Sequence, residues 1–165
     1  MKIKKIVSGG QSGVDRAALD VARQRGLEIG GWCPRGRLAE DGPLSRDYPL
    51  RETPKTDYRQ RTAWNVRDSD ATLILHRGEL SGGTALTADL ARRQGSPCLL
   101  VNLLQPPLPE MVLCWTEEKQ VRVLNVAGPR ESQQPGIYAL ASRFLDQVLD
   151  PDRKRVARRR HDPVS

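Results

Sequence analysis

A glycine-rich loop that joins an apolar run to a helix-like segment occurs twice in this chain, and this repeated unit most constrains the fold. In the first unit KIKKIV leads through SGGQSG into VDRAALDVARQRG, and in the second ATLILH leads through RGELSGG into TALTADLARRQG. A strand, a loop and a helix in this order are the parts of a parallel βαβ arrangement. The chain is therefore predicted to be an α/β protein.

Five apolar runs predict strands, and five segments between or after them predict helices. The strand-like runs are 2–7, 27–33, 71–76, 98–104 and 121–128, and the helix-like segments are 14–26, 58–68, 84–95, 106–119 and 137–149. Continuous apolar strands are typical of a sheet that helices cover on both faces, which predicts a mostly parallel sheet of about five strands. Right-handed crossovers then place the loops that follow the strands on one carboxyl edge, where open α/β sheets bind ligands.

The connection at 34–57 is rich in proline, glycine and charge and is longer than connections usually are in a compact domain. Loops of more than about 15 residues are uncommon unless they serve as functional loops or lids. Within it, Arg35, Arg37, Glu40, Asp41 and Gly42 combine charge with turn-forming residues. Two interpretations stay open, a solvated loop and a lid that faces a ligand.

Composition indicates one soluble domain at 1–150 followed by a basic, disordered tail at 151–165. The tail holds six basic residues and two aspartates, so it carries four of the seven net positive charges of the 165-residue chain. Such a tail lacks the interleaved aromatic residues of many nucleic-acid binders, and nucleic acid is not the expected partner. No apolar run approaches the roughly 20 residues of a membrane span, and no secretory signal is recognisable. We expect a cytoplasmic protein.

The cysteines and histidines argue against a metal centre. Cys33, Cys98 and Cys114 are far apart and form no C-x-x-C pair, and His76 and His161 are the two histidines. Neither a thiolate zinc site nor a histidine-centred catalytic relay is expected from this set. Cys98, inside an apolar run, is expected to be a core residue.

The two glycine loops supply most of the candidate binding residues. Glycines allow close backbone approach, and a helix that begins after such a loop offers N–H groups to an anion. Neither loop matches G-x-G-x-x-G or the Walker pattern, so plain structural turns remain the alternative. The candidates are Ser8, Gly9, Gly10, Gln11, Ser12 and Gly13 in the first loop and Gly82, Gly83, Thr84 and Thr87 at the second.

Three charged residues complete the candidate site. Asp15 lies in the first helical turn, where it either compensates the helix dipole or binds amino or hydroxyl groups of a ligand. Arg130 follows the last strand-like run and could pair with a phosphate or carboxylate, and Arg35 begins the long connection. Each has a plain alternative as a surface residue.

Several stretches together resemble a known family. SGGQSGVDRAALDVA, GGWCPRGRLAEDG, YPLRET, YRQRTAWNVRDSDATLIL, LSGGTALT and LNVAGPRES occur in order over about residues 3–149, and they are similar to the molybdenum carrier family of the SLOG superfamily. The resemblance implies a Rossmann-like three-layer α/β/α sandwich and a homo-oligomer, dimer or tetramer. It also implies carriage of molybdenum cofactor (molybdopterin), or of a related phosphorylated pterin or nucleotide-like ligand, with molybdoenzymes as partners.

The same superfamily includes phosphoribohydrolases that carry the motif G-G-x-G-T-x-x-E. Thr87 stands where the glutamate of that motif would lie, and a hydroxyl cannot replace a carboxylate as general acid or base. We therefore expect a binding protein without catalytic residues. Hydrolysis of nucleoside monophosphates stays as the alternative, with Glu52 or Asp89 as a carboxylate from elsewhere in the chain.

Overall fold

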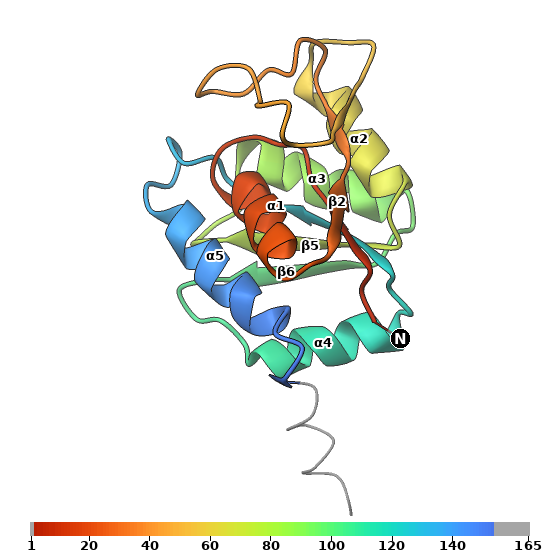
Figure 1. Cartoon of the computed structure of the whole chain (residues 1–165), viewed down its shortest axis with the longest axis vertical. Helices are drawn as coiled ribbons and strands as arrows, with labels where there is room; N and C mark the ends of the chain where they lie inside the picture. The colour runs from red at the N-terminus through yellow and green to blue at the C-terminus, as the bar shows by residue number, and fades with distance from the viewer. Residues whose placement is uncertain (1, 154–165) are drawn as a thin grey trace, which may run out of the picture.

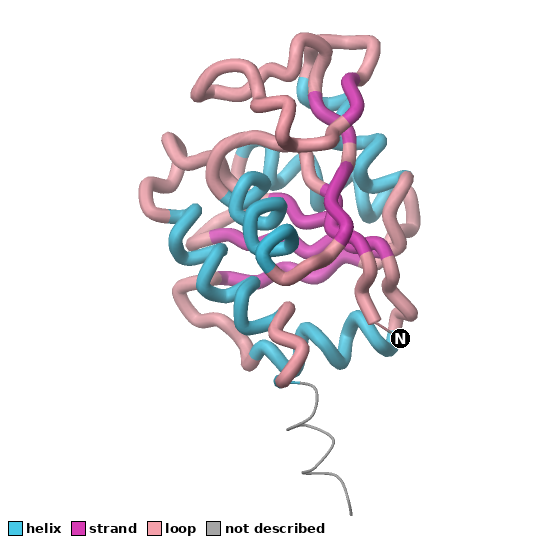
Figure 2. Tube along the Cα trace, in the orientation of Figure 1, coloured by secondary structure: helices cyan, strands magenta, loops and turns pink. Residues whose placement is uncertain are grey.

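A five-stranded parallel sheet forms the centre of the protein, as expected from the sequence. The computed structural model describes residues 2–153, and the strands in Figure 2 lie between helices on both sides. The strand order is β2-β1-β7-β5-β6, and every neighbouring pair is parallel. The strands are β1 (Lys5–Val7), β2 (Glu28–Gly30), β5 (Ala71–His76), β6 (Cys98–Asn102) and β7 (Val123–Ala127).

Five helices cover the two faces of this sheet and complete a Rossmann-like three-layer sandwich. They are α1 (Val14–Gln24), α2 (Tyr58–Arg67), α3 (Gly82–Arg93), α4 (Pro109–Glu118) and α5 (Ile137–Val148). Helices α1, α4 and α5 share one apolar core with the sheet, and Figure 1 shows α1 and α5 side by side on the near face. Helices α2 and α3 pack against each other, with α3 against β5 and β6. No helix within residues 2–153 is long and apolar enough to cross a membrane.

The residues at the predicted apolar positions form the core. All six residues of β5 are buried, because this strand lies inside the sheet and has helices on both faces. The stripes expected on the first and last helices also face inward: Val14 and Ala18 of α1, and Ala141 and Leu145 of α5, are at most 1% exposed. The hydrophobic face of each helix therefore fixes its position on the sheet.

The expectation of a fully buried strand at 98–104 is wrong. This strand, β6, lies at the edge of the sheet, where one face is incompletely covered, and Leu100 is 47% exposed. Cys98 is half-buried on the same strand and is not a full core residue. An edge position cannot be deduced from the apolar run, because the run has the same composition as a central strand.

The strand expected at 27–33 is divided in two by Gly31. Beyond β2 the chain turns at Gly31, whose φ is +123°, and a Cβ there would lie 2.4 Å from the Ser8 carbonyl oxygen. The chain then forms β3 (Trp32–Cys33), which pairs in parallel with β4 (Arg51–Glu52) outside the main sheet. This small sheet forms the base of the long connection.

The long connection at 34–57 is folded onto α1. Leu44 and Leu50 are buried with Leu19 and Cys33 in a second apolar cluster. The Arg37 guanidinium ties the segment together by donating to four backbone carbonyls, those of Leu44, Ser45, Tyr48 and Leu50. In Figure 1 the segment lies above the end of the sheet where β1 leads into α1. Of the tail predicted at 151–165, residues 154–165 lie outside the described residues.

Candidate functional site

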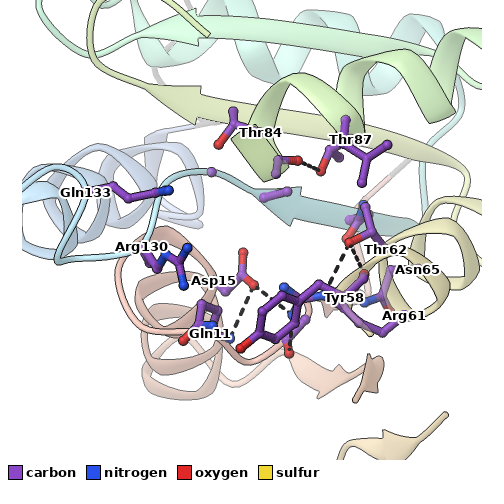
Figure 3. Close-up of a pocket in the computed structure, with 16 residues that line it drawn as sticks. Gln11, Asp15, Tyr58, Arg61, Thr62, Asn65, Thr84, Thr87, Arg130 and Gln133 are labelled. Carbon is purple, nitrogen blue, oxygen red and sulfur yellow. Dashed lines mark hydrogen bonds and ion pairs between the residues drawn. The ribbon is translucent and has the colours of Figure 1, made fainter. Parts of the chain in front are cut away.

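A pocket of ≈ 120 Å³ lies beyond the carboxyl ends of β1 and β7, between α1, α2 and α3. In Figure 3 Thr84 and Thr87 lie above it, Asp15 and Gln11 below, Arg130 and Gln133 on one side and Arg61 on the other. The residues that line it come from four parts of the chain: Gly9, Gln11, Asp15; Tyr58, Arg61, Thr62, Asn65; Gly83, Thr84, Leu86, Thr87; and Asn125, Ala127, Gly128, Arg130, Gln133.

The second glycine loop opens α3 toward this pocket. Helix α3 begins at Gly82, and its N-cap Ser81 makes no side-chain capping bond. Within residues 2–153 no hydrogen bond takes up the N–H of Gly83 or Thr84. A Cβ built on Gly83 would meet no atom within 4 Å. Because free N–H groups and the helix dipole both favour negative charge, this helix end is chemically suited to an anion.

The glycines of the first loop serve close packing instead. A Cβ on Gly9 would lie 1.9 Å from Arg61 Nη1, one on Gly10 2.7 Å from Leu44 Cδ2, and one on Gly13 2.4 Å from the Pro129 carbonyl oxygen. Three segments thus approach the loop backbone from different sides. The first loop therefore packs against α2, the long connection and the segment after β7, and it fixes their positions relative to one another.

Most backbone N–H groups of the first loop are also taken up within the chain. Gly10 N–H donates to Ser8 Oγ over 3.3 Å, Gln11 N–H to an Asp15 carboxylate oxygen over 3.3 Å, and Ser12 N–H to Gln11 Oε1 over 3.0 Å. The N–H of Val14 donates to the Pro129 carbonyl oxygen. The first loop therefore uses most of its N–H donors within the chain.

Asp15 and Arg61 form a buried ion pair in the pocket wall. An Asp15 carboxylate oxygen lies 3.5 Å from Arg61 Nη1, and the two side chains are 7% and 11% exposed. Arg61 also donates to the Gly9 carbonyl oxygen over 2.7 Å and stacks over Tyr58. Burial raises the pKa of Asp15 above its usual 3.8, although Arg61 opposes this shift. The pocket thus contains a carboxylate whose charge is balanced by one specific cation.

Arg61 is a pocket residue that the sequence did not reveal, and Asn125, at the end of the last strand, is a pocket residue outside the predicted binding set. The buried residues of α2 are Arg61, Asn65 and Val66, so two polar residues one turn apart occupy the inner face of this helix. That unusual polar stripe is the signal in the sequence. Asn125 is 2% exposed on β7 and donates to Thr72 Oγ1 over 3.2 Å.

The remaining candidate residues are divided between the pocket and other places. Arg130 reaches the pocket, and Thr87 lines it while its hydroxyl donates to the Gly83 carbonyl oxygen. Candidates outside the pocket are Ser8, Gly10, Ser12, Gly13, Arg35 and Gly82. The Ser8 hydroxyl donates to the Asp15 carbonyl oxygen, and Ser12 and Gly13 line a second hollow.

The two carboxylates considered for hydrolysis lie elsewhere. Glu52 accepts the Gly36 N–H over 2.7 Å, and Asp89 pairs with Arg92 and Arg93 on α3. Of the described residues that line the pocket, Asp15 is the one with a carboxylate. The pocket as a whole can hold an anion at α3 and polar groups near Asp15 and Asn125.

Comparison with known proteins agrees with this architecture. Residues 6–149 match the circularly permuted YpsA SLOG family. The crystal structure of a "Putative molybdenum carrier protein" from Syntrophus aciditrophicus SB superposes with a TM-score of 0.86 at 45% identity, over 89% of this chain and 95% of that one. No curated protein matches. This chain belongs to the circularly permuted YpsA SLOG family.

Proposed function

We propose that the pocket binds the phosphate of a small ligand and that the protein carries molybdenum cofactor or a related phosphorylated pterin or nucleotide. The observation that carries this proposal is the N-terminus of α3, where Gly83 and Thr84 line the pocket and their N–H groups have no partner in the described residues. Arg130 adds a guanidinium to the same pocket. N–H groups at a helix end together with a guanidinium are typical of phosphate binding.

The residues present fit a phosphate and the polar groups next to it. Asp15 and Asn125 can exchange hydrogen bonds with amino or hydroxyl groups next to the phosphate. Within residues 2–153 no three His, Cys, Asp or Glu side chains gather as a metal site. The name of the S. aciditrophicus protein supports molybdenum-related cargo.

Hydrolysis of a nucleoside monophosphate is the second candidate function. Asp15 favours it, because a buried carboxyl with a raised pKa can hold a proton for a leaving base. Against it, the hydroxyl of Thr87 replaces the glutamate of the phosphoribohydrolase motif and is directed to the Gly83 carbonyl oxygen. Release of free base from AMP or GMP that is lost in Asp15→Asn would favour the enzyme over the carrier.

Calorimetric titration tests the binding site. We expect AMP, used as a phosphorylated probe, to bind the wild type and to lose at least tenfold in affinity in Gly83→Asp, where a carboxylate takes the place of phosphate. The matched control is Gln24→Asp, which adds the same charge at an exposed position at the opposite end of α1 from the pocket residue Asp15. Equal affinity in all three proteins would refute the site. Native mass spectrometry with elemental analysis of gently purified protein then identifies the cargo.

We also propose that the protein self-associates. A group of exposed apolar residues supports a location for the interface between copies. Leu100, Leu104, Leu108 and Met111 lie within one stretch of the chain and are 47–68% exposed. Leu100 belongs to the edge strand β6, whose outer backbone groups can pair with a second copy. Light scattering should give a dimer or larger, and Leu100→Asp with Leu104→Asp should give a monomer.

A further inference from the structure

Glu40, at the tip of the long connection, sits in a small anion site built by two other segments. Its carboxylate accepts hydrogen bonds from the Ser12 hydroxyl, the Ser132 hydroxyl and, over 3.1 Å, the Ser132 N–H. Arg130 Nε lies 3.8 Å from the same carboxylate. Three donors and a guanidinium around one carboxylate are the contacts that a phosphate group would make.

This anion site lies in the wall between two hollows. Arg130 and Gln133 line the pocket of ≈ 120 Å³ described above, whereas Ser132 and Glu131 line a neighbouring hollow of ≈ 720 Å³. The first loop forms the other stretch of this wall: Gln11 lines the small pocket, and Ser12 lines the large hollow. Glu40 bonds both stretches, because its N–H also donates to Gln11 Oε1 over 2.7 Å.

The volumes of the two hollows indicate that a whole ligand has to extend past this wall. Sites for small ligands usually span about 300–1,000 Å³, so the small pocket alone holds a phosphate and little more. The larger hollow contains two tyrosines, Tyr48 and Tyr138, whose hydroxyls both donate to Asp20. Aromatic rings and a carboxylate suit a heterocycle that carries N–H donors.

We propose that Ser12, Ser132 and Arg130 form a second phosphate subsite, which Glu40 occupies until the ligand displaces it. The ligand is then a compound with two linked phosphates, such as a nucleoside diphosphate, that extends from α3 across the wall into the larger hollow. This inference rests on the proposed phosphate site at α3. Displacement of Glu40 also frees Arg130, whose guanidinium becomes available to both phosphates.

Glu40 can move out of this anion site while the rest of the long connection stays folded. The side chain of Glu40 is 20% exposed, so solvent reaches its carboxylate. Its neighbour Asp41 is held separately by a bidentate pair with Arg16. The apolar cluster around Leu44 and Leu50 lies further along the segment and keeps its own contacts. Partial burial of Glu40 disfavours its ionised form, but the bonds from Ser12 and Ser132 outweigh this and lower its pKa. Glu40 is therefore a charged competitor at neutral pH.

Calorimetry with AMP and ADP on three full-length proteins tests the subsite. The wild type should bind ADP at least tenfold more tightly than AMP, because the second phosphate gains charge-assisted bonds. Glu40→Gln, which keeps the shape but removes the competing charge, should bind ADP about fivefold more tightly than the wild type. The gain for AMP should be smaller, because its single phosphate lies at α3 and gains only the freed Arg130 guanidinium. Asp47→Asn is the matched control: it removes one negative charge from the same connection at an exposed residue that lines neither hollow, so both affinities should stay within about twofold.

Two results would overturn the subsite. One is weaker or unchanged ADP binding in Glu40→Gln, and the other is an equal gain in Asp47→Asn, which would assign the effect to the net charge of the connection. Amide exchange gives a readout independent of the α3 site: millimolar inorganic pyrophosphate should speed exchange at Glu40, whose N–H loses its bond to Gln11. If neither nucleotide binds but pyrophosphate still releases Glu40, the proposed function fails and the subsite stands; no release by pyrophosphate refutes the subsite.

Discussion

The Gly9→Ala substitution tests how the first glycine loop stabilises the protein. A methyl group at this position would lie 1.9 Å from Arg61 Nη1 and 2.5 Å from Arg61 Cζ, so the guanidinium has to move. Gly9 itself does not lie in the left-handed region, and backbone strain plays no part. The loss arises entirely from the contacts that Arg61 gives up.

The magnitude follows from those contacts. Arg61 loses its 2.7 Å hydrogen bond to the Gly9 carbonyl oxygen, and bonds from charged donors contribute about 1.5–3 kcal/mol. Asp15 loses its 3.5 Å ion-pair partner, and separating a buried pair costs about 3–5 kcal/mol when the remaining charge stays ionised. Because Asp15 can instead take up a proton, we expect a total decrease of about 2–4 kcal/mol in the free energy of unfolding.

Urea unfolding of a double-mutant cycle measures this effect. In an Arg61→Ala background the obstacle is absent, so Gly9→Ala should change the free energy of unfolding by less than about 0.5 kcal/mol. Gly83→Ala is the control: its methyl group meets no atom within 4 Å, and alanine in a helix should maintain or slightly raise stability. An equal loss from Gly9→Ala with and without Arg61 would refute the reasoning.

Three further outcomes follow from the site. The raised pKa of Asp15 means that the folded protein holds this proton more tightly than the unfolded chain, so wild-type stability should rise relative to Asp15→Asn as pH falls from 7.5 toward 4.5. Urea titrations at the two pH values check this, and a difference that shrinks or reverses on acidification would contradict it. Arg130→Ala should weaken AMP binding about tenfold or more while stability changes by less than about 0.5 kcal/mol, because the Arg130 side chain is 37% exposed. A chain that ends at Arg153 should bind AMP within about twofold of the full-length protein, since every residue that lines the pocket precedes it; loss of binding would give the tail a role.

The sequence predicted the strands, the helices and the edge of the sheet where the pocket lies. Apolar periodicity located α1 and α5 because their core faces, such as Val14 and Ala141, repeat at helical spacing. It could not distinguish a central strand from an edge strand, and so Leu100 was wrongly expected to be buried. Edge positions depend on the order of strands, which a pattern within one strand does not contain.

The candidate site was harder to deduce because loop composition does not tell how the backbone N–H groups are used. SGGQSG and LSGG look alike, yet the first is packed against Arg61 and Leu44 and bonded within the chain, whereas the second is open at Gly83. Arg61 comes from a helix distant in sequence and enters the pocket through tertiary packing. Glu40 was recognised as part of a charged loop, but its contact with Ser132 is a long-range one.

The central claim is that the N-terminus of α3 holds a phosphate, and amide chemical shifts test it most directly. In a titration of the isotopically labelled protein with AMP, the account predicts that the largest changes occur at the N–H groups of Gly83 and Thr84, because hydrogen bonds to phosphate deshield the donor proton. Saturating AMP that leaves these two resonances in place, or that shifts the bonded amides of Gly10 and Ser12 instead, would contradict the account.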